Sequence, residues 1–372
     1  MNKSDIIILV TNDVSTDTRV SKIKHSLAQH FQTNLHCFSD PEKTYNDDID
    51  VRRLVKYRKI GSYKKLRQFI TYFLFILKNL FYSRSSHSIY ANDLDCLVVA
   101  YLMKIFNRNL TLIYDSHELH TDTHWNYKKK LKRYFIFLIE KIMIKKVDIV
   151  ITVSPGIASI LNMRHQLDCI VLPNSLPRYD CALEDQNLSD TPEHILSILG
   201  DNKKKLCVFH GGLTLGRGIE EILEIAHLEK FENVDFLFIG DGPLKNSIRE
   251  ANAKNIFHLS YIEHAQLLIV LRHADFGFIL YKTDCLNHKL ALPNKLFEYA
   301  MCNVVTVYDD MTEVDKLCKD HCIGIPLQEF LKNSGEDVYS ENDREKWFSE
   351  FNRSYNWNTN FLPVVREIKK RI

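Results

Sequence analysis

The chain has 372 residues, more than one hydrophobic core normally serves, so two domains of roughly 150 to 200 residues are expected. Hydrophobic residues make up 45% of the sequence and charged residues 26%, which is typical of a folded protein without long disordered stretches. The formal net charge of +2 argues against a dedicated nucleic-acid binder, which must neutralise many phosphates.

Cysteine usage and the first residues indicate a cytoplasmic location. The nine cysteines are odd in number and several lie inside apolar runs, which predicts reduced, mostly buried thiols. The N-terminus, MNKSDIIILVTND, has a short apolar run and no small-residue cleavage site, so it predicts a first strand rather than a signal peptide. No stretch approaches the roughly 20 apolar residues of a spanning helix.

Short apolar runs alternate with longer helical patterns along the whole chain, which predicts βαβ units and mainly parallel sheets. In the first half we expect strands at 6–10, 35–38, 88–90, 110–114, 147–153 and 170–173. After a polar segment, 178–205, read as a linker plus a short helix, further strands are expected at 206–210, 234–240, 256–260, 274–281 and 304–308. The last residues carry helical spacing and predict a terminal helix that packs back across the domain junction.

The loops that follow the strands are the places to seek chemistry, because ligands of open α/β sheets lie beyond the carboxyl ends of the strands. In the first half, Asp115, His117 and Glu118 follow a predicted strand and place a proton-transfer or hydrogen-bonding group there. A lone histidine is more often structural, so both interpretations stay open.

Two clusters have the residue types of a metal site. Asp93 and Asp95 match a DxD pattern, although Asn92 or Asp93 serves equally well as the cap of the following helix, which we prefer. The CKDHC segment at 318–322 lacks a second ligand pair with suitable spacing for zinc, so chance explains it better. We therefore predict no metal.

A glycine-containing loop, HGGLTLGRG, follows the first strand of the second half and leads into a helix. Gly211 and Gly212 would let backbone amides approach an anion, and Arg217 adds a positive charge near the helix start. A glycine turn with a surface arginine explains the loop equally well.

The segment ALPNKLFEYAMCNVVTVYD is the most informative one. Pro293 suits a first helical turn, and Lys295 and Glu298 lie three residues apart and so share one face of the helix. A lysine for a diphosphate and a carboxylate for vicinal hydroxyls would suit a nucleoside diphosphate. The alternative is an ordinary ion pair on a helix surface.

A buried strand followed by Gly240, Asp241, Gly242 and Pro243 can bring backbone close to a nucleotide, though a plain strand-to-helix turn explains it almost as well. No GxGxxG spacing or GxxxxGK[ST] loop occurs, which weakens dinucleotide-binding and P-loop alternatives.

Taken in order, these segments resemble glycosyltransferase family four. The matching pieces are DTRVSKIKHSL, ANDLDCL, YDSHEL, ITVSPGI, VLPNS, GGLTLGRGIEEIL, FLFIGDGPL, HADFGFILY and LPNKLFEYA. The resemblance implies the α/β GT-B fold, in which two Rossmann-like domains face their parallel sheets across a central cleft. We expect an acceptor-binding domain at 1–175, with a helix at 355–372 packing back on it, and a nucleotide-sugar-binding domain at 176–354.

The resemblance also implies roles for particular residues. The donor nucleotide would contact Gly212, Arg217, Gly240, Asp241, Gly242, Lys295 and Glu298, with Glu298 on the ribose hydroxyls. Catalysis would rest on His117 near the donor sugar and on Arg217 and Lys295, which would stabilise the leaving diphosphate without a metal or other cofactor. Asp13, Asp17 and Arg19 would lie on the acceptor side.

The sequence departs from the family pattern in three places. Leu290 stands where the family often has a glutamate, eight positions before Glu298. The loop after the first strand reads TNDVSTD instead of a glycine-rich loop, and Leu213 replaces a second basic residue. The donor sugar and the stereochemical outcome are therefore left open.

A run of basic residues without any acid extends over 51–84 and encloses FITYFLFIL, which is too short to span a bilayer but able to lie in a headgroup layer. We interpret this run as a surface for an anionic membrane. A second run, YKKKLKRYFIFLIEKIMIKK at 127–146, has a similar composition, and for it we prefer a buried helix with solvated lysine ends.

The leading hypothesis is a cytoplasmic, peripherally membrane-associated glycosyltransferase. It would move a sugar from a nucleoside-diphosphate donor to a glycan or lipid-linked acceptor, with retention, in bacterial surface polysaccharide assembly such as lipopolysaccharide or capsule. One alternative is a sugar-nucleotide epimerase or hydrolase on the same fold. Another is a non-catalytic nucleotide-sugar-binding protein, which the missing glutamate at position 290 would favour.

Overall fold

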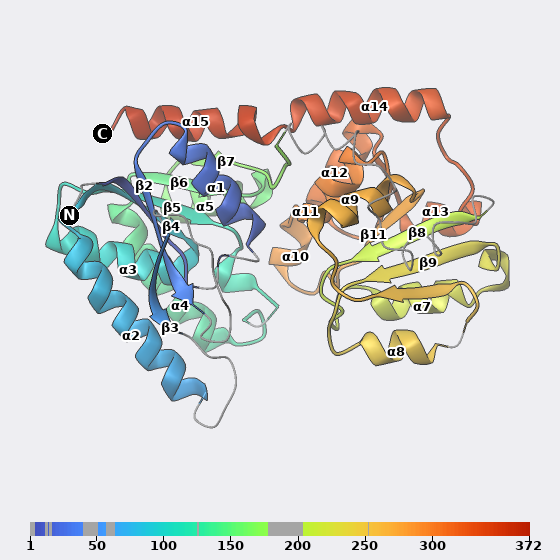
Figure 1. Ribbon diagram of the computed structural model, residues 1–372, viewed down its shortest axis with the longest axis horizontal. Coiled ribbons are helices and arrows are strands. Elements are labelled where there is room, and N and C mark those ends of the chain that lie inside the picture. Colours follow the sequence, from blue (N-terminus) through green and yellow to red (C-terminus); the bar gives the residue numbers. More distant parts are fainter. Residues whose placement is uncertain are drawn as a thin grey trace. The chain divides into compact units, whose positions relative to one another are not determined.

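The computed structural model describes residues 4–11, 14, 17–39, 51–56, 64–124, 126–177, 204–251 and 253–372. The chain divides into two compact units, one formed by Met1–Pro173 with Asn360–Ile372 and the other by Asn174–Thr359 (Figure 1). The sequence predicts a boundary after residue 175, and the division falls after Pro173. The predicted linker and short helix at 178–205 lie largely outside the described residues.

The first unit is built on a seven-stranded parallel sheet with the order β3-β2-β1-β4-β5-β6-β7. Its strands are β1 (Ser4–Leu9), β2 (Thr33–Ser39), β3 (Val51–Lys56), β4 (Ser86–Asn92), β5 (Thr111–Ser116), β6 (Ile149–Thr152) and β7 (Cys169–Val171). The central strands are nearly continuous apolar runs because helices cover both faces of the sheet. The strand order reverses between β1 and β4, and ligands of such sheets bind outside this point.

Side-chain caps mark the start of two of the helices described in the first unit. They are α1 (Thr18–Ala28), α2 (Lys64–Tyr82), α3 (Asp93–Phe106), α4 (Lys130–Met143), α5 (Pro155–His165) and most of α15 (Trp357–Lys369). Asp17 caps α1 by accepting a hydrogen bond from the Val20 amide at 3.1 Å, and Ser154 caps α5 in front of Pro155. The helices α2, α3 and α4 share one buried cluster on one face of the sheet.

The second unit has a six-stranded parallel sheet with the order β10-β9-β8-β11-β12-β13. The strands are β8 (Lys205–His210), β9 (Val234–Ile239), β10 (Ile256–Leu259), β11 (Phe276–Ile279), β12 (Val305–Tyr308) and β13 (Gly324–Pro326). The helices are α7 (Ile219–Ala226), α8 (Lys245–Glu250), α9 (His264–Arg272), α10 (Leu286–Leu290), α11 (Asn294–Met301), α12 (Thr312–His321), α13 (Leu327–Asn333) and α14 (Glu341–Ser354). Again the strand order reverses, here between β8 and β11.

Every strand that the sequence predicts overlaps an observed strand, but two strands were missed. Strand β3 falls inside the basic run that we interpreted as a membrane surface, so its residues belong to the sheet edge instead. Strand β13 has three residues and ends in Pro326, which leaves little pattern to detect. The expected terminal helix is two helices, α14 and α15, separated at Tyr355 and Asn356. Among the described residues no helix combines the length and apolar character needed to cross a bilayer.

Two glycines after neighbouring strands make a contrasting pair. Gly240 follows β9 with a φ of +136°, and a Cβ there would lie 2.0 Å from the carbonyl oxygen of Gly211. A Cβ at Gly212 would meet only the Thr214 methyl group at 4.0 Å. We expect Gly240→Ala to lower the free energy of unfolding by roughly 3 kcal/mol and Gly212→Ala to change it by about 0.5 kcal/mol or less. Urea denaturation measures both, and equal stability of the two variants would contradict the close approach of the loops.

Candidate functional site

In the second unit the loops after β8 and β9 pack against each other at the carboxyl edge of the sheet. The Gly211 amide donates to the Ile239 carbonyl at 2.8 Å, and the Leu213 amide donates to the Asp241 carbonyl at 3.0 Å. A Cβ at Gly242 would approach the Leu213 carbonyl oxygen to 2.3 Å, so this glycine is required by the packing of the two loops. Gly212 faces open space and leaves its backbone accessible.

The side chain of Asp241 holds this turn together. Its carboxylate pairs with Lys245 and accepts a hydrogen bond from the Tyr261 amide at 3.0 Å. These contacts give Asp241 a structural role, and its predicted contact with a nucleotide stays a prediction.

Lys295, on the first turn of α11, is the most unusual charged residue of the unit. Its side chain is buried, with 5% of the residue exposed, and its Nζ has no hydrogen-bond partner among the described residues. The Nζ lies 3.5 Å from the centre of the Phe209 ring, and a Cβ on Gly211 would be 3.9 Å away from it. An unpaired buried ammonium is costly, so its presence indicates a site for an anion.

Electrostatics support this interpretation. Burial lowers the pKa of Lys295 well below its ordinary value, the nearby positive charge of Arg217 lowers it further, and Glu298 raises it. Arg217 itself lies over the Tyr281 ring and donates to the Tyr281 hydroxyl at 3.5 Å. Two cations that disfavour each other in the same place would both be stabilised by a bound polyanion.

Glu298, one turn after Lys295, is also buried and lies between two histidines. His264 contacts its Oε1 at 3.1 Å, and His210, the last residue of β8, lies 3.4 Å from its Oε2. Burial lowers the pKa of His210 to about 4, so this ring is neutral at physiological pH.

These contacts exclude one of the two interpretations of the Lys295 and Glu298 spacing, and nucleotide binding stays a prediction. The interpretation as an ion pair on a helix surface is wrong, because both residues are buried and no ion pair joins them. His210 and His264 were not among the predicted site residues. His210 stands directly before Gly211 in the sequence, so its position at the end of a strand was a usable signal, whereas His264 is 34 residues away from its partner.

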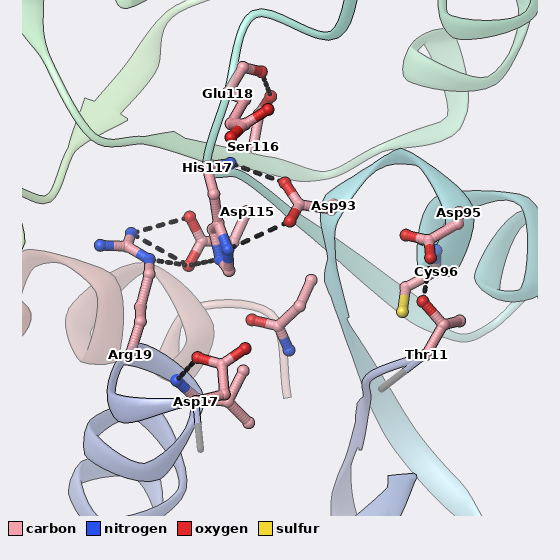
Figure 2. A network of polar contacts seen from close by, with 12 residues as sticks. Thr11, Asp17, Arg19, Asp93, Asp95, Cys96, Asp115, Ser116, His117 and Glu118 are labelled. Carbon is pink, nitrogen blue, oxygen red and sulfur yellow. Dashed lines mark hydrogen bonds and ion pairs between the residues drawn. The ribbon is translucent and has the colours of Figure 1, made fainter. Parts of the chain in front are cut away.

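In the first unit a buried polar network joins the carboxyl ends of β4 and β5 to α1 (Figure 2). Arg19 donates from Nη2 to Asp115 Oδ1 at 2.8 Å and from Nε to Oδ2 at 3.2 Å, and its Nη1 donates to the Leu172 carbonyl at 3.0 Å. Tyr90 donates its hydroxyl to Asp115 at 2.8 Å. Arg19 and Asp115 therefore form a buried ion pair that is satisfied by further hydrogen bonds.

His117 lies between the carboxylates of Asp93 and Asp115. Its Nδ1 is 3.2 Å from Asp93 Oδ2 and its Nε2 is 3.5 Å from Asp115 Oδ2, while its backbone amide donates to Asp93 Oδ1 at 2.9 Å (Figure 2). Burial lowers the pKa of His117, but Asp93 and Asp115 outweigh it and raise the pKa to about 10. His117 is therefore an imidazolium at neutral pH, so it donates hydrogen bonds and does not act as a base.

Asp93 organises this network at a backbone cost. Its φ is +65°, a region that aspartate tolerates better than most residues, and its Oδ1 also lies 3.2 Å from Nε2 of His120. Asn92 occupies the cap position of α3, but its side chain donates to the Leu9 carbonyl and makes no capping bond. We predicted that Asn92 or Asp93 caps the helix with its side chain. The prediction is wrong for Asn92, and the carboxylate of Asp93 contacts His117 and His120.

The remaining acceptor-side residues are placed as follows. The side chain of Asp17 caps α1, and that of Arg19 is engaged by Asp115. Asp13 lies outside the described residues. Contact of these three with an acceptor stays a prediction.

One group of metal-ligand residue types comes together in the described part of the chain. Ligand atoms of Asp284, Cys285 and His288 lie within 4.8 Å of one another at the start of α10. Nδ1 of His288 already contacts the Lys282 carbonyl oxygen at 2.7 Å, and three ligands are fewer than a structural zinc site uses. We assign no metal to this group.

No protein-family model and no curated protein matches the sequence. Solved structures match over the full length. Sucrose-phosphate synthase from Thermosynechococcus elongatus is 12% identical with a TM-score of 0.74, and 99% of each chain is covered. HepE from Anabaena in complex with UDP and glucose is 13% identical with a TM-score of 0.74 over 99% of this chain and 100% of that one. The alpha,alpha-trehalose 6-phosphate synthase of Burkholderia multivorans is 11% identical with a TM-score of 0.67 over 100% and 99%.

These structures confirm the expected fold class. Two parallel α/β sheets of seven and six strands match the GT-B fold, and the chain therefore has that fold. Identities this low show the fold only, so membership of glycosyltransferase family four stays a prediction.

Proposed function

We propose that the protein is a glycosyltransferase that takes its sugar from a nucleoside-diphosphate donor bound in the second unit. The observation that carries the proposal is the buried, unpaired Nζ of Lys295 beside the accessible backbone of Gly212 and the cation Arg217. A diphosphate supplies the negative charge that this group of residues lacks. The structures of HepE contain UDP, glucose or UDP-glucose, which makes a uridine diphosphate sugar the first donor to test.

In this proposal the residues of the second unit share the work of binding the donor and stabilising its departure. Lys295 and Arg217 neutralise charge that grows on the diphosphate as the glycosidic bond breaks, so their interaction is stronger in the transition state than in the ground state. Glu298 accepts hydrogen bonds from the ribose hydroxyls, and His264 holds its carboxylate in place. No metal is needed for this charge stabilisation.

The first unit would receive the acceptor and contribute His117. Because His117 is held as an imidazolium, we assign it electrostatic stabilisation of a nearby sugar or phosphate oxygen, and not removal of the acceptor proton. We propose that the anomeric configuration is retained, with attack and departure on the same face of the sugar. Nuclear magnetic resonance of the product reads the configuration directly, and inversion would contradict this part of the proposal.

The biological setting is a further part of the proposal. We infer assembly of a bacterial surface polysaccharide on a lipid-linked or glycan acceptor, because the first unit exposes a basic and apolar surface suited to lipid. The sequence departure at Leu290, on α10, lies beside the donor residues in the chain and leaves the identity of the sugar open.

Calorimetric titration with UDP, GDP, ADP, CDP and dTDP tests the donor site. We expect one of them, with UDP first, to bind, and the corresponding sugar nucleotides to release it when an acceptor extract is added. Binding of none would overturn the proposal. Release at the same rate without acceptor would favour a hydrolase or epimerase on the same fold.

A further inference from the structure

Three neighbouring helices of the first unit present apolar side chains to solvent. Helices α2, α3 and α4 contribute Phe75, Met103 and Met143 to one buried cluster beneath them (Figure 1). Their outward sides carry most of the exposed large hydrophobic residues in the described part of the chain: Phe69, Ile70, Phe73, Leu74, Leu77, Phe81, Ile105, Phe106, Leu131, Tyr134, Phe135, Leu138, Ile139 and Ile142. We call this surface the basic apolar face. Soluble monomers rarely expose so many apolar side chains together, which indicates an interaction surface.

The exposed residues of α2 form a continuous stripe. Phe69, Phe73 and Phe81 lie at multiples of four residues, which places them on one side of a helix, and Phe81 is 85% exposed. Phe75 and Asn79 occupy the opposite side and are fully buried against the unit. The helix therefore has two apolar sides. One packs against the core, and the other faces solvent.

Helix α4 corrects our preference for a buried helix. Leu131, at 71% exposure, and Ile142 lie on its outward side, whereas Glu140 is buried. The inward orientation of Glu140 is fixed by Tyr114, whose hydroxyl donates to Oε1 at 2.9 Å, and by His165, at 3.6 Å from Oε2. Since the polar residue is satisfied inside, the apolar side of α4 faces solvent as a stable arrangement.

The exposed charged residues on α2 and α4 have one sign. Helix α2 contains no acidic residue, and the only one in α4 is the buried Glu140. The exposed basic residues on the two helices and the segments that flank them are Lys78, Arg84, Lys128, Lys129, Lys130, Lys132, Lys141, Lys145 and Lys146. Apolar side chains ringed by lysines complement a surface that offers hydrocarbon below a layer of negative charge.

A pocket at the C-terminal end of α3 adds a site for one anionic group. It measures about 350 Å³ and is lined by Tyr101, Lys104, Ile105, Arg108 and Lys146. Lys104 is paired with Asp148, whereas Arg108 and Lys146 make no ion pair with the described residues. A helix C-terminus repels anions, so the attraction comes from these two side chains.

We propose that the basic apolar face docks on an anionic membrane surface, with α2 and α4 lying in the headgroup layer and the pocket holding the phosphate of an anionic lipid. Docking at the interface suits helices that are too short or too polar to span. The proposal does not depend on the transfer reaction, because membrane binding can be measured without donor or acceptor.

Sedimentation with vesicles tests the proposal. The full-length protein is expected to bind vesicles that contain 30 mol% phosphatidylglycerol in phosphatidylcholine and not vesicles of phosphatidylcholine alone. Each basic residue near an anionic surface contributes about fivefold, so Arg108→Gln with Lys146→Gln should weaken the partition coefficient roughly 25-fold. Phe69→Gln with Phe81→Gln should weaken it as well, without loss of stability, because both side chains are exposed.

The matched control removes two charges from the same unit, away from the face. Arg366 and Lys369 are exposed on α15, which runs along the other side of the sheet from α2 and α3 (Figure 1). Arg366→Gln with Lys369→Gln should leave binding within about twofold of wild type. An equal loss in the control, or unchanged binding in both test variants, would overturn the proposal. So would a concentration-dependent dimer in analytical ultracentrifugation that Phe69→Gln with Phe81→Gln dissolves, since a second copy would then cover the face.

Discussion

Replacing Lys295 by methionine is expected to weaken donor binding strongly and at the same time to stabilise the protein. The buried Nζ would make charge-assisted hydrogen bonds to the diphosphate, worth about 3 kcal/mol, so the affinity for the nucleoside diphosphate should fall roughly a hundredfold. In the free protein the same ammonium is buried without a hydrogen-bond partner among the described residues, and methionine removes that cost. We expect the free energy of unfolding to rise by about 2 kcal/mol.

The pH dependence separates this explanation from a general packing effect. The pKa of Lys295 is lowered in the folded protein, so folding is penalised wherever the lysine of the unfolded chain is charged, below about pH 10.4. The stability advantage of Lys295→Met should therefore shrink as the pH rises from 7 towards 10. Lys316→Met is the control, because Lys316 is exposed on α12 of the same unit, and it should change neither affinity nor stability. A less stable Lys295→Met variant with normal affinity would remove Lys295 from the site.

The sequence predicted most of the sheet because parallel strands covered on both faces are apolar runs that stand out between helical patterns. Strand β3 reads VRRLVK and lies at an edge of its sheet, where basic side chains can reach solvent. Its apolar residues alternate only weakly, so its basic composition led us to predict a membrane surface instead of a strand. The missed strand thus reflects its position in the sheet, which no local pattern specifies.

Parts of the candidate site were predictable where helix phase or strand ends determine the geometry. Lys295 and Glu298 share a side of α11 because they are three residues apart, and the sequence shows this directly. The burial of that side depends on packing between distant segments. So do the positions of His210 and His264 beside Glu298. The family resemblance supplied roles for the first pair and nothing for the two histidines.

The orientation of helix α4 was also not predictable from the sequence. Its apolar periodicity is compatible with either side facing the sheet, and we preferred the buried orientation for the apolar side. The choice is made by Tyr114 and His165, which satisfy Glu140 inside the unit. Long-range hydrogen bonding to one carboxylate therefore decides which side of a helix is left for a partner.

Replacing Asp93 by asparagine is expected to lower the pKa of His117, because it removes one of the two carboxylates that hold His117 charged. Asparagine tolerates the positive φ of this position and can still accept the hydrogen bond from the His117 amide, so the substitution removes mainly the negative charge. A buried imidazolium that loses one of its two carboxylates should cost about 3 kcal/mol of stability at pH 6. Asp95→Asn is the matched control, because Asp95 makes no ion pair with the described residues, and burial and the charge of Asp93 raise its pKa to about 6. It should change stability by less than about 1 kcal/mol.

The sign of the pH dependence follows from the raised pKa of His117. In the wild type, its contribution to stability is fully present below the unfolded pKa of about 6.5 and is lost as the pH rises through about 10. In Asp93→Asn the pKa should fall by more than one unit, so part of that contribution is already lost at a lower pH than in the wild type. Imidazole titration by nuclear magnetic resonance and urea denaturation between pH 6 and 10 measure both. A wild-type His117 that titrates below pH 7 would show that the two carboxylates do not hold it charged, and His117 would then be available as a base.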